Sequence, residues 1–87
     1  MPEVSRFNGI TIHFYYDDHN PPHFHAIYGK QEALFSIKTL EIIKGELPRK
    51  ITLLVVQWAF LHREELLENW ERVKKDQQPH KIKPLKK

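Results

Sequence analysis

The hydrophobic pattern of this chain changes its period at Pro48, and that change constrains the fold more than any other feature. From Arg49 to about Lys75 the sequence contains no Gly or Pro, and Pro is itself favoured at a first helical position. At about 100° per residue, most of the large apolar side chains of this run gather on one side. The pattern predicts one long amphipathic helix whose apolar side carries Ile51, Leu54, Val55, Trp58, Leu61, Leu66 and Val73.

Before Pro48 the apolar residues alternate with polar ones, which is typical of β-strands. Asn8-Gly9 supplies the two positive-φ residues of a type I′ turn, so we expect a hairpin there. Residues 23–28 alternate again, and the run EALFSIKTLEII forms either one long bent strand or two short ones. We therefore predict an α+β fold, with a small antiparallel β-sheet of three to four strands packed by one long C-terminal helix.

A chain of 87 residues has room for one domain and one modest core. We predict that domain over residues 1–76, followed by a basic, flexible tail over residues 77–87. The net charge of +3 comes from the Lys-rich end of the chain, and the remainder holds more Asp and Glu than Lys and Arg. Such a tail suits phosphate contacts, an acidic partner surface, or a merely solvated end.

The composition also excludes several classes of protein. The absence of Cys excludes disulfides, Cys-based zinc clusters and thiol chemistry. No apolar run approaches the roughly 20 residues needed to span a bilayer. The first residues, MPEVSRF, have neither a basic start nor an apolar signal core, so a cytoplasmic location without membrane contact is expected.

Residues 17–25 read DDHNPPHFH, and they concentrate the groups that carry chemistry. His23 and His25 are separated by one residue, so on a strand they point the same way and can converge on one ion or one phosphate. Asp18 lies just before them and offers a third ligand, as do its neighbours Asp17 and His19. A divalent transition metal such as zinc, nickel or iron is the cofactor that His23, His25 and Asp18 would suit.

His13 can join the pair in one strand register only. If the apolar faces of the two strands coincide, the numbers of opposed residues sum to an even number, as for His13 opposite His25. The composition favours this register. Tyr15 and the three histidines then share the face opposite the core residues Ile10, Ile12, Phe14 and Phe24.

The same loop fits three other interpretations. His23 and His25, with Tyr15, can act as general acid and base on a phosphodiester without metal. An open sheet face can bind nucleic acid through protonated histidines, aromatic rings and arginines. The prolines can also simply stiffen a turn whose Asp side chains bond to nearby backbone amides. The candidate binding residues near the sheet are His13, His19, Arg6 and Arg49.

Polar residues interrupt the predicted helix on the side that should be apolar. Trp58, His62, Glu65 and Asn69 lie within about 60° of one another. His62 and Glu65 must be paired or solvated there, because a lone buried charge is costly. Either they bond to each other or to the sheet's backbone, or they form the second wall of a catalytic cleft that includes the histidine loop, with Trp58 as a binding residue.

The first half of the helix, ITLLVVQWAFL, is apolar almost all round. It offers more apolar surface than one small sheet needs to cover, so the tail and first strand wrap it or a second subunit does. This surplus favours a homodimer or an obligate protein partner.

Three segments, MPEVSRFNGITIHFY, DHNPPHFHA and HREELLENW, resemble in order and spacing the bacterial family known as domain of unknown function 4160. The resemblance runs from Pro2 to about Val73, and this chain departs from many relatives in its Lys-rich end. It implies a compact α+β domain, no established activity, and genes beside another small protein of unknown function, as in toxin–antitoxin pairs. The recurrent positions, none with an assigned catalytic role, map onto Pro21, Pro22, His23, His25, Glu65, Leu66 and Trp70, and Trp70 joins the binding candidates.

Three functions follow as hypotheses, and whether the protein is an enzyme stays open. The first is an effector of a toxin–antitoxin-like two-gene cassette that acts on or binds nucleic acid through His23 and His25. The second is a non-enzymatic, antitoxin-like module whose helix docks a small cognate protein encoded nearby. The third is a domain that holds a metal through its histidines.

Overall fold

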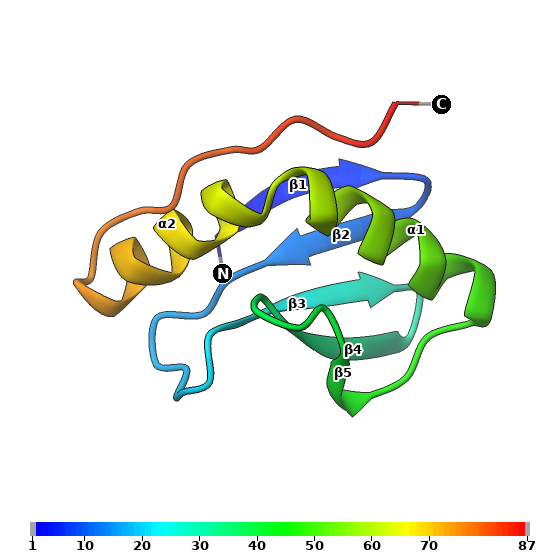
Figure 1. The fold of residues 1–87 in the computed structure, drawn as a ribbon, viewed down its shortest axis with the longest axis horizontal. Helices are drawn as coiled ribbons and strands as arrows, with labels where there is room; N and C mark the ends of the chain where they lie inside the picture. The colour runs from blue at the N-terminus through cyan, green and yellow to red at the C-terminus, as the bar shows by residue number, and fades with distance from the viewer. Residues whose placement is uncertain (1, 87) are drawn as a thin grey trace.

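The structure, a computed structural model, describes residues 2–86. Within them, five antiparallel strands follow one another across a single sheet in sequence order, and two consecutive helices pack on one face (Figure 1). The strands are β1 (Glu3–Phe7), β2 (Ile10–His13), β3 (His23–Tyr28), β4 (Gln31–Ser36) and β5 (Ile42–Gly45). The helices are α1 (Arg49–Leu61) and α2 (Arg63–Lys74). The α+β class is thus confirmed, whereas the predicted three to four strands and one long helix are wrong in number.

The additional strand arises because the EALFSIKTLEII run is two strands separated by a tight turn. Leu40 adopts a φ of +61° in that turn, and its amide donates to the Ser36 carbonyl at 2.8 Å. The Ser36 hydroxyl accepts a further bond from the Thr39 amide. A leucine in the left-handed region is unusual, so the sequence carries no clear signal for this turn.

The helical run divides at His62, although it contains no Gly or Pro. His62 has φ −123° and ψ 26°, which ends α1 and starts α2. Its Nδ1 hydrogen-bonds the Glu65 carboxylate at 2.6 Å, and Glu64 and Glu65 occupy the first turn of α2. Acidic residues there interact favourably with the helix dipole, so the new helix start is locally stabilised.

The strand register is the one that composition favoured. Asn8 and Gly9 have φ of 51° and 77° and connect β1 to β2 as the type I′ prediction requires. In the β2–β3 pair, Ile12 lies opposite Ala26 and His13 lies opposite His25. The even register is confirmed. One sheet face therefore joins the helices in a core that includes Val4, Ile10, Ile12, Phe14, Phe24, Phe35, Val55, Trp58, Leu66 and Trp70.

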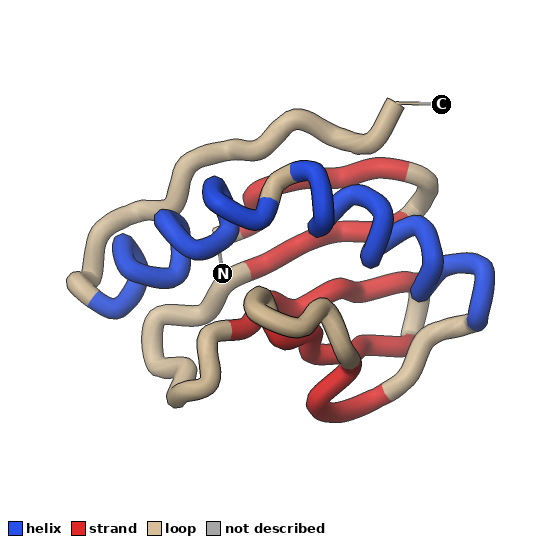
Figure 2. Tube along the Cα trace, viewed as in Figure 1, coloured by secondary structure: helices blue, strands red, loops and turns tan. Residues whose placement is uncertain are grey.

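Residues 77–86, expected as a flexible tail, lie extended beside α2 and β1 (Figure 2). The Ile82 amide donates to the Val4 carbonyl at 2.8 Å, and the Ile82 side chain is only 4% exposed. The Trp58 indole donates to the Lys83 carbonyl at 2.8 Å. The Asn69 side chain exchanges two hydrogen bonds with the His80 backbone, so this segment covers one edge of the core.

Neither helix of residues 2–86 is long and apolar enough to cross a membrane.

Candidate functional site

The loop between β2 and β3 folds back over the start of β3 and carries Asp18 to that point. The Lys74 ammonium, at the end of α2, donates to the Asp18 carbonyl at 2.9 Å. On the other arm of the loop, the Ile37 amide donates to the Pro22 carbonyl at 3.0 Å. The Asn20–Pro21 peptide bond between these arms is cis. The loop that carries Asp18 is therefore attached to the end of α2 by one arm and to Ile37, just after β4, by the other.

Asp18, His23 and His25 come together at this junction. Asp18 Oδ2 lies 2.9 Å from His25 Nε2, with which it shares a hydrogen bond, and 3.2 Å from His23 Nε2. The second contact is not aligned for a hydrogen bond, so the buried His23 Nε2 has no hydrogen-bond partner among residues 2–86. Each of the three residues offers one possible ligand atom, and these three atoms all lie within 4.8 Å of one another.

The opposite ring nitrogens of both histidines face acceptors. His23 Nδ1 lies 2.8 Å from the Pro21 carbonyl oxygen, and His25 Nδ1 lies 2.8 Å from Glu32 Oε2. A carbonyl can only accept a hydrogen bond, and so can an ionised carboxylate. His23 Nδ1 therefore carries a proton and donates it to the Pro21 carbonyl, which leaves the His23 Nε2 lone pair free near Asp18, while the His25 ring has a carboxylate at each nitrogen.

This arrangement leaves the site short of positive charge. A neutral imidazole has one N–H, yet each ring lies between two acceptors. A second proton on each ring is one way to supply the missing charge, and one cation bound by both Nε2 atoms and the carboxylate is another. The first places two imidazolium rings with centroids only 5.2 Å apart. A single divalent cation instead satisfies the three groups together.

The two distances from Asp18 Oδ2 to the histidine Nε2 atoms are close to those between ligands of one metal ion. Two ligands each about 2.0–2.1 Å from a zinc ion are about 3.3 Å apart in a tetrahedral site. The 2.9 and 3.2 Å contacts of Asp18 are within a few tenths of an ångström of that separation. The Pro21 carbonyl and the Glu32 carboxylate are the kind of outer partner that fixes the tautomer of a metal-binding histidine.

A surface pocket opens beside the cluster. It is lined by Asp18, His25, Glu32, Leu34, Lys44 and Gly45. His23 does not line it, since its side chain is 6% exposed and its ring packs 5.2 Å from that of Trp70. Only Asp18 and His25, of the three clustered residues, are thus reached from this pocket.

Tyr15 and His13 extend the cluster along the open sheet face. The Tyr15 ring is nearly perpendicular to the His25 ring, with centroids 4.1 Å apart. It is nearly parallel to the His13 ring, with centroids 6.5 Å apart. Burial raises the pKa of the Tyr15 phenol, and the carboxylates of Glu32 and Asp18 raise that pKa further. Tyr15 therefore stays neutral near pH 7, which makes it a proton donor and not a base. Burial also lowers the pKa of His13, although the Glu3 carboxylate opposes that change.

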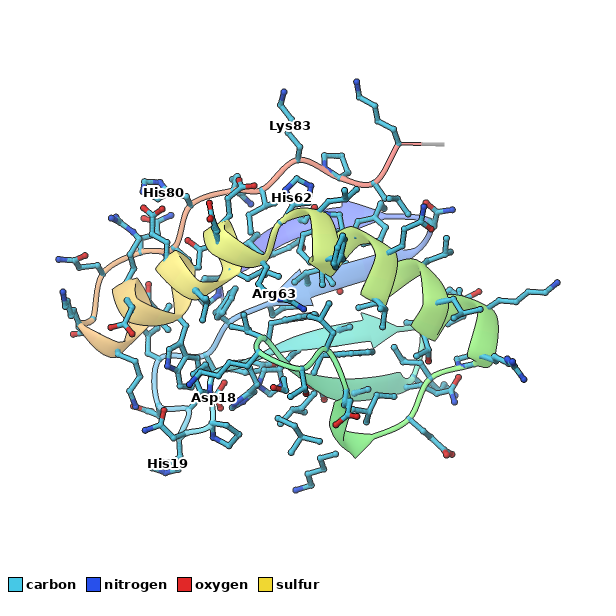
Figure 3. The ribbon with its side chains drawn as sticks, viewed as in Figure 1. Asp18, His19, His62, Arg63, His80 and Lys83 are labelled. Carbon is cyan, nitrogen blue, oxygen red and sulfur yellow. The ribbon has the colours of Figure 1, made fainter. Side chains whose placement is uncertain are left out.

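His62 and Glu65 are not part of this cluster. They pair with each other at the α1–α2 junction, where the His62 ring packs 5.5 Å from Trp58. Figure 3 places His62 beside the chain near Lys83, well apart from Asp18. The catalytic cleft that would have joined His62 and Glu65 to the histidine loop is not assembled. The structure instead shows the alternative in which His62 and Glu65 bond to each other.

The remaining binding candidates are dispersed. His19 is exposed on the outer side of the loop (Figure 3). Arg6 is exposed and pairs with Glu3 at 2.8 Å, and Arg49 is exposed at the start of α1. Trp58 is fully buried, so it presents no surface to a ligand, whereas Trp70 packs on His23 and supports the cluster from the helix side.

Sequence reasoning missed Glu32 and Lys44. The Gly29-Lys30 turn pairs Tyr28 with Gln31, which places Glu32 on the same face as His25. That pairing could have been derived from the two-residue turn. Lys44 could not, because its position depends on the Leu40 turn and on a register shift in the β4–β5 pair.

The fold and the site together define a small two-layer α+β domain with a two-histidine, one-carboxylate cluster at the start of its central strand, β3. The model of the family described as "Domain of unknown function (DUF4160)" matches residues 9–71, so the chain belongs to that family. The resemblance inferred from the sequence motifs is confirmed, and the matched span contains Asp18, His23 and His25. No match was found among curated proteins or among solved structures.

Proposed function

We propose that this protein binds one first-row divalent metal ion through Asp18 Oδ2, His23 Nε2 and His25 Nε2. The observation that carries the proposal is the pair of imidazoles, each with Nδ1 on an acceptor and Nε2 within 3.2 Å of one shared carboxylate oxygen. The three residues are those that the spacing of the loop suggested as metal ligands.

The number of ligands favours a reactive or ligand-binding metal over a purely structural one. Structural zinc sites are closed by four protein ligands, whereas catalytic sites keep three and leave a position open. Two histidines and one carboxylate are also the ligands of non-haem iron sites with open positions. Asp18 and His25 line the neighbouring pocket, so an open position on that side is accessible to a small molecule.

Metal binding explains the site better than metal-free acid and base catalysis. A general base must reach the proton that it removes. His23 is buried and lies outside the pocket lining, and His25 Nε2 is already bonded to Asp18. Catalysis by the His23 and His25 pair, the nucleic-acid role and the two-gene cassette stay predictions. The cassette hypothesis predicts that expression without the neighbouring protein is toxic. It also predicts that His23→Ala with His25→Ala abolishes this toxicity.

Titration calorimetry of untagged protein with zinc, nickel or manganese tests the metal proposal. The wild type should bind about one equivalent, because the cluster has one set of ligands. The double variant His23→Ala with His25→Ala should lose this binding. His19→Ala is the matched control, since His19 lies in the same loop but is exposed, and it should bind as the wild type does. Equal binding by all three proteins, or by none, contradicts the proposal.

A second candidate function is self-association through the outer side of α1. Leu53, Phe60 and Leu61 are 59%, 66% and 65% exposed there, which is high for large apolar side chains. Together with Gln57 they form what we call the outer stripe. The surplus of apolar surface expected from the sequence is therefore located on this face.

Charge at the two ends of the outer stripe favours a second copy of the chain as the occupant. Arg49 and Lys50 are exposed at the start of α1, while Glu64 and Glu68 are exposed on α2 beyond its end. The two helices run nearly end to end across the sheet (Figure 1). A two-fold axis at Gln57 therefore brings the basic end of one copy to the acidic end of the other.

Sedimentation at about 100 µM, well above the dissociation constant of a moderately stable dimer, tests this candidate. The wild type should sediment as a dimer, and Phe60→Glu should convert it to a monomer. Ile43→Glu is the control, because Ile43 is also exposed and apolar but lies on β5, an edge strand away from the outer stripe. A monomeric wild type, or equal effects of the two substitutions, rules out the outer stripe as a dimer interface.

A further inference from the structure

The pocket beside the metal ligands contains one cationic side chain, Lys44, among its lining residues. Lys44 lies opposite Leu34 on β4, and Leu34 lies opposite His25 on β3. The three side chains thus form one row across the open face of the sheet. Within residues 2–86, Lys44 makes neither an ion pair nor a side-chain hydrogen bond, so its three N–H donors are available to a ligand.

The charge of the pocket depends on the metal. Asp18 and Glu32 outweigh Lys44 by one negative charge when the site holds no ion, which disfavours an anion. A divalent metal reverses the balance and leaves the pocket, Lys44 included, with one net positive charge. The carboxylates of Asp18 and Glu32 both contact histidine side chains, and Lys44 pairs with neither of them.

We propose that the pocket binds a phosphate group, with one oxygen in the open coordination position of the metal and another accepting from Lys44 Nζ. The inference rests on the metal-binding function and extends it to a class of ligand. Metals that keep open positions readily take phosphate oxygens, and the flexible lysine stem acts as a point charge for such groups. A phosphorylated small molecule is the ligand class that this pairing would recognise.

Gly45 shapes the pocket beside Lys44. A Cβ added there would lie 2.2 Å from the Glu32 carbonyl oxygen, and Gly45 has a φ of +81°. Only glycine permits this close approach of β5 to β4. The backbone of Lys44 is thereby held next to Glu32, the residue that orients His25, so the lysine and the two histidine ligands belong to one sheet.

Inorganic phosphate is the probe, titrated by calorimetry into protein loaded with one equivalent of metal and into protein freed of metal. The loaded wild type should bind phosphate and the metal-free protein should not. Lys44→Gln should lower the phosphate affinity about ten- to a hundredfold, the loss expected for one charged hydrogen bond. Its metal affinity in the absence of phosphate should stay within about threefold of the wild type, since Lys44 is not a ligand. Lys38→Gln, an exposed lysine in the β4–β5 turn, is the matched control.

The outcomes separate this inference from the metal proposal. Metal uptake without phosphate binding overturns the inference alone, and so does equal phosphate affinity of the Lys44→Gln and Lys38→Gln proteins. Absence of metal uptake in the first step overturns the metal proposal and the inference together. Phosphate binding to the metal-free protein with the affinity of the loaded protein also contradicts the inference, because the metal would then contribute nothing to the site.

Discussion

The carboxylate of Asp18 hydrogen-bonds His25 Nε2 at 2.9 Å, although the two residues come from opposite ends of a proline-containing loop. The same oxygen is 3.2 Å from His23 Nε2. The loop therefore places one carboxylate oxygen beside the Nε2 atoms of two imidazoles. The turn also orients one of the proposed ligands, because the Pro21 carbonyl accepts from His23 Nδ1 and so fixes the His23 tautomer.

Asp18→Asn should lower metal affinity by more than about 100-fold. Loss of an outer partner of a metal site typically lowers affinity about 10–100-fold, and Asp18 is a direct ligand in this account. Asp17→Asn is the control, since Asp17 is the exposed neighbour. Calorimetric titration of both variants measures the difference, and similar affinities for the two would remove Asp18 from the ligand set.

Glu32→Ala should lower metal affinity about 10–100-fold, because Glu32 accepts the Nδ1 proton of His25 and increases the basicity of that ring. Glu32→Gln keeps an acceptor oxygen but no charge, so its effect should be smaller. Glu41→Ala, an exposed residue in the β4–β5 turn, should change nothing. An equal affinity for the Ala and Gln variants at position 32 would show that the hydrogen bond is unimportant.

The free energy of unfolding should decrease below about pH 6.5, and His13 should account for part of the decrease. Burial lowers the pKa of His13 in the folded protein below its ordinary value of 6.5. The unfolded chain then binds a proton that the folded chain does not. The stabilisation is therefore complete above the ordinary pKa and is lost as pH falls toward the lower, folded-state pKa.

Urea unfolding of metal-free protein at about pH 7.5 and about pH 5.5 measures this effect. His13→Gln removes the titrating group and should show a smaller decrease than the wild type. His19→Gln, at an exposed histidine, should behave as the wild type does. If His13→Gln leaves the decrease unchanged, the pH dependence comes from other groups.

Ile82→Ala should destabilise the protein by about 2 kcal/mol or more, the usual effect of truncating a buried Ile. Ile82 is 4% exposed, and its amide donates to the Val4 carbonyl. Lys83→Ala is the control, because its side chain is exposed and its carbonyl can still accept from Trp58. Lys83→Ala should change the free energy of unfolding by less than about 0.5 kcal/mol. Equal, small effects would show that residues 77–86 do not stabilise the core.

Local chemistry made much of the sheet predictable from the sequence. Asn8-Gly9 specifies its own turn type, and the alternation around His13 and His25 selects the register that buries the apolar faces together. Because HxH spacing on a strand points both rings one way, the sequence also picked out three residues that the structure brings together, namely Asp18, His23 and His25.

Long-range packing produced the features that the sequence did not predict. The helix ends at His62 without Gly or Pro, and the turn at Leu40 uses a residue that rarely adopts positive φ. The Lys-rich segment looks solvated by composition, yet Ile82 and the Asn69 amide tie it to the core. Lys44 became recognisable only once the β4–β5 register was known.

Anomalous diffraction from crystals grown with zinc tests the central claim most directly. The account predicts one strong peak within about 2.0–2.2 Å of Asp18 Oδ2, His23 Nε2 and His25 Nε2. The exposed His80 and Glu68, whose nearest side-chain atoms are 3.8 Å apart, provide an internal comparison for adventitious surface binding. A peak at that surface pair with none between Asp18 and the two histidines would contradict the proposed metal centre.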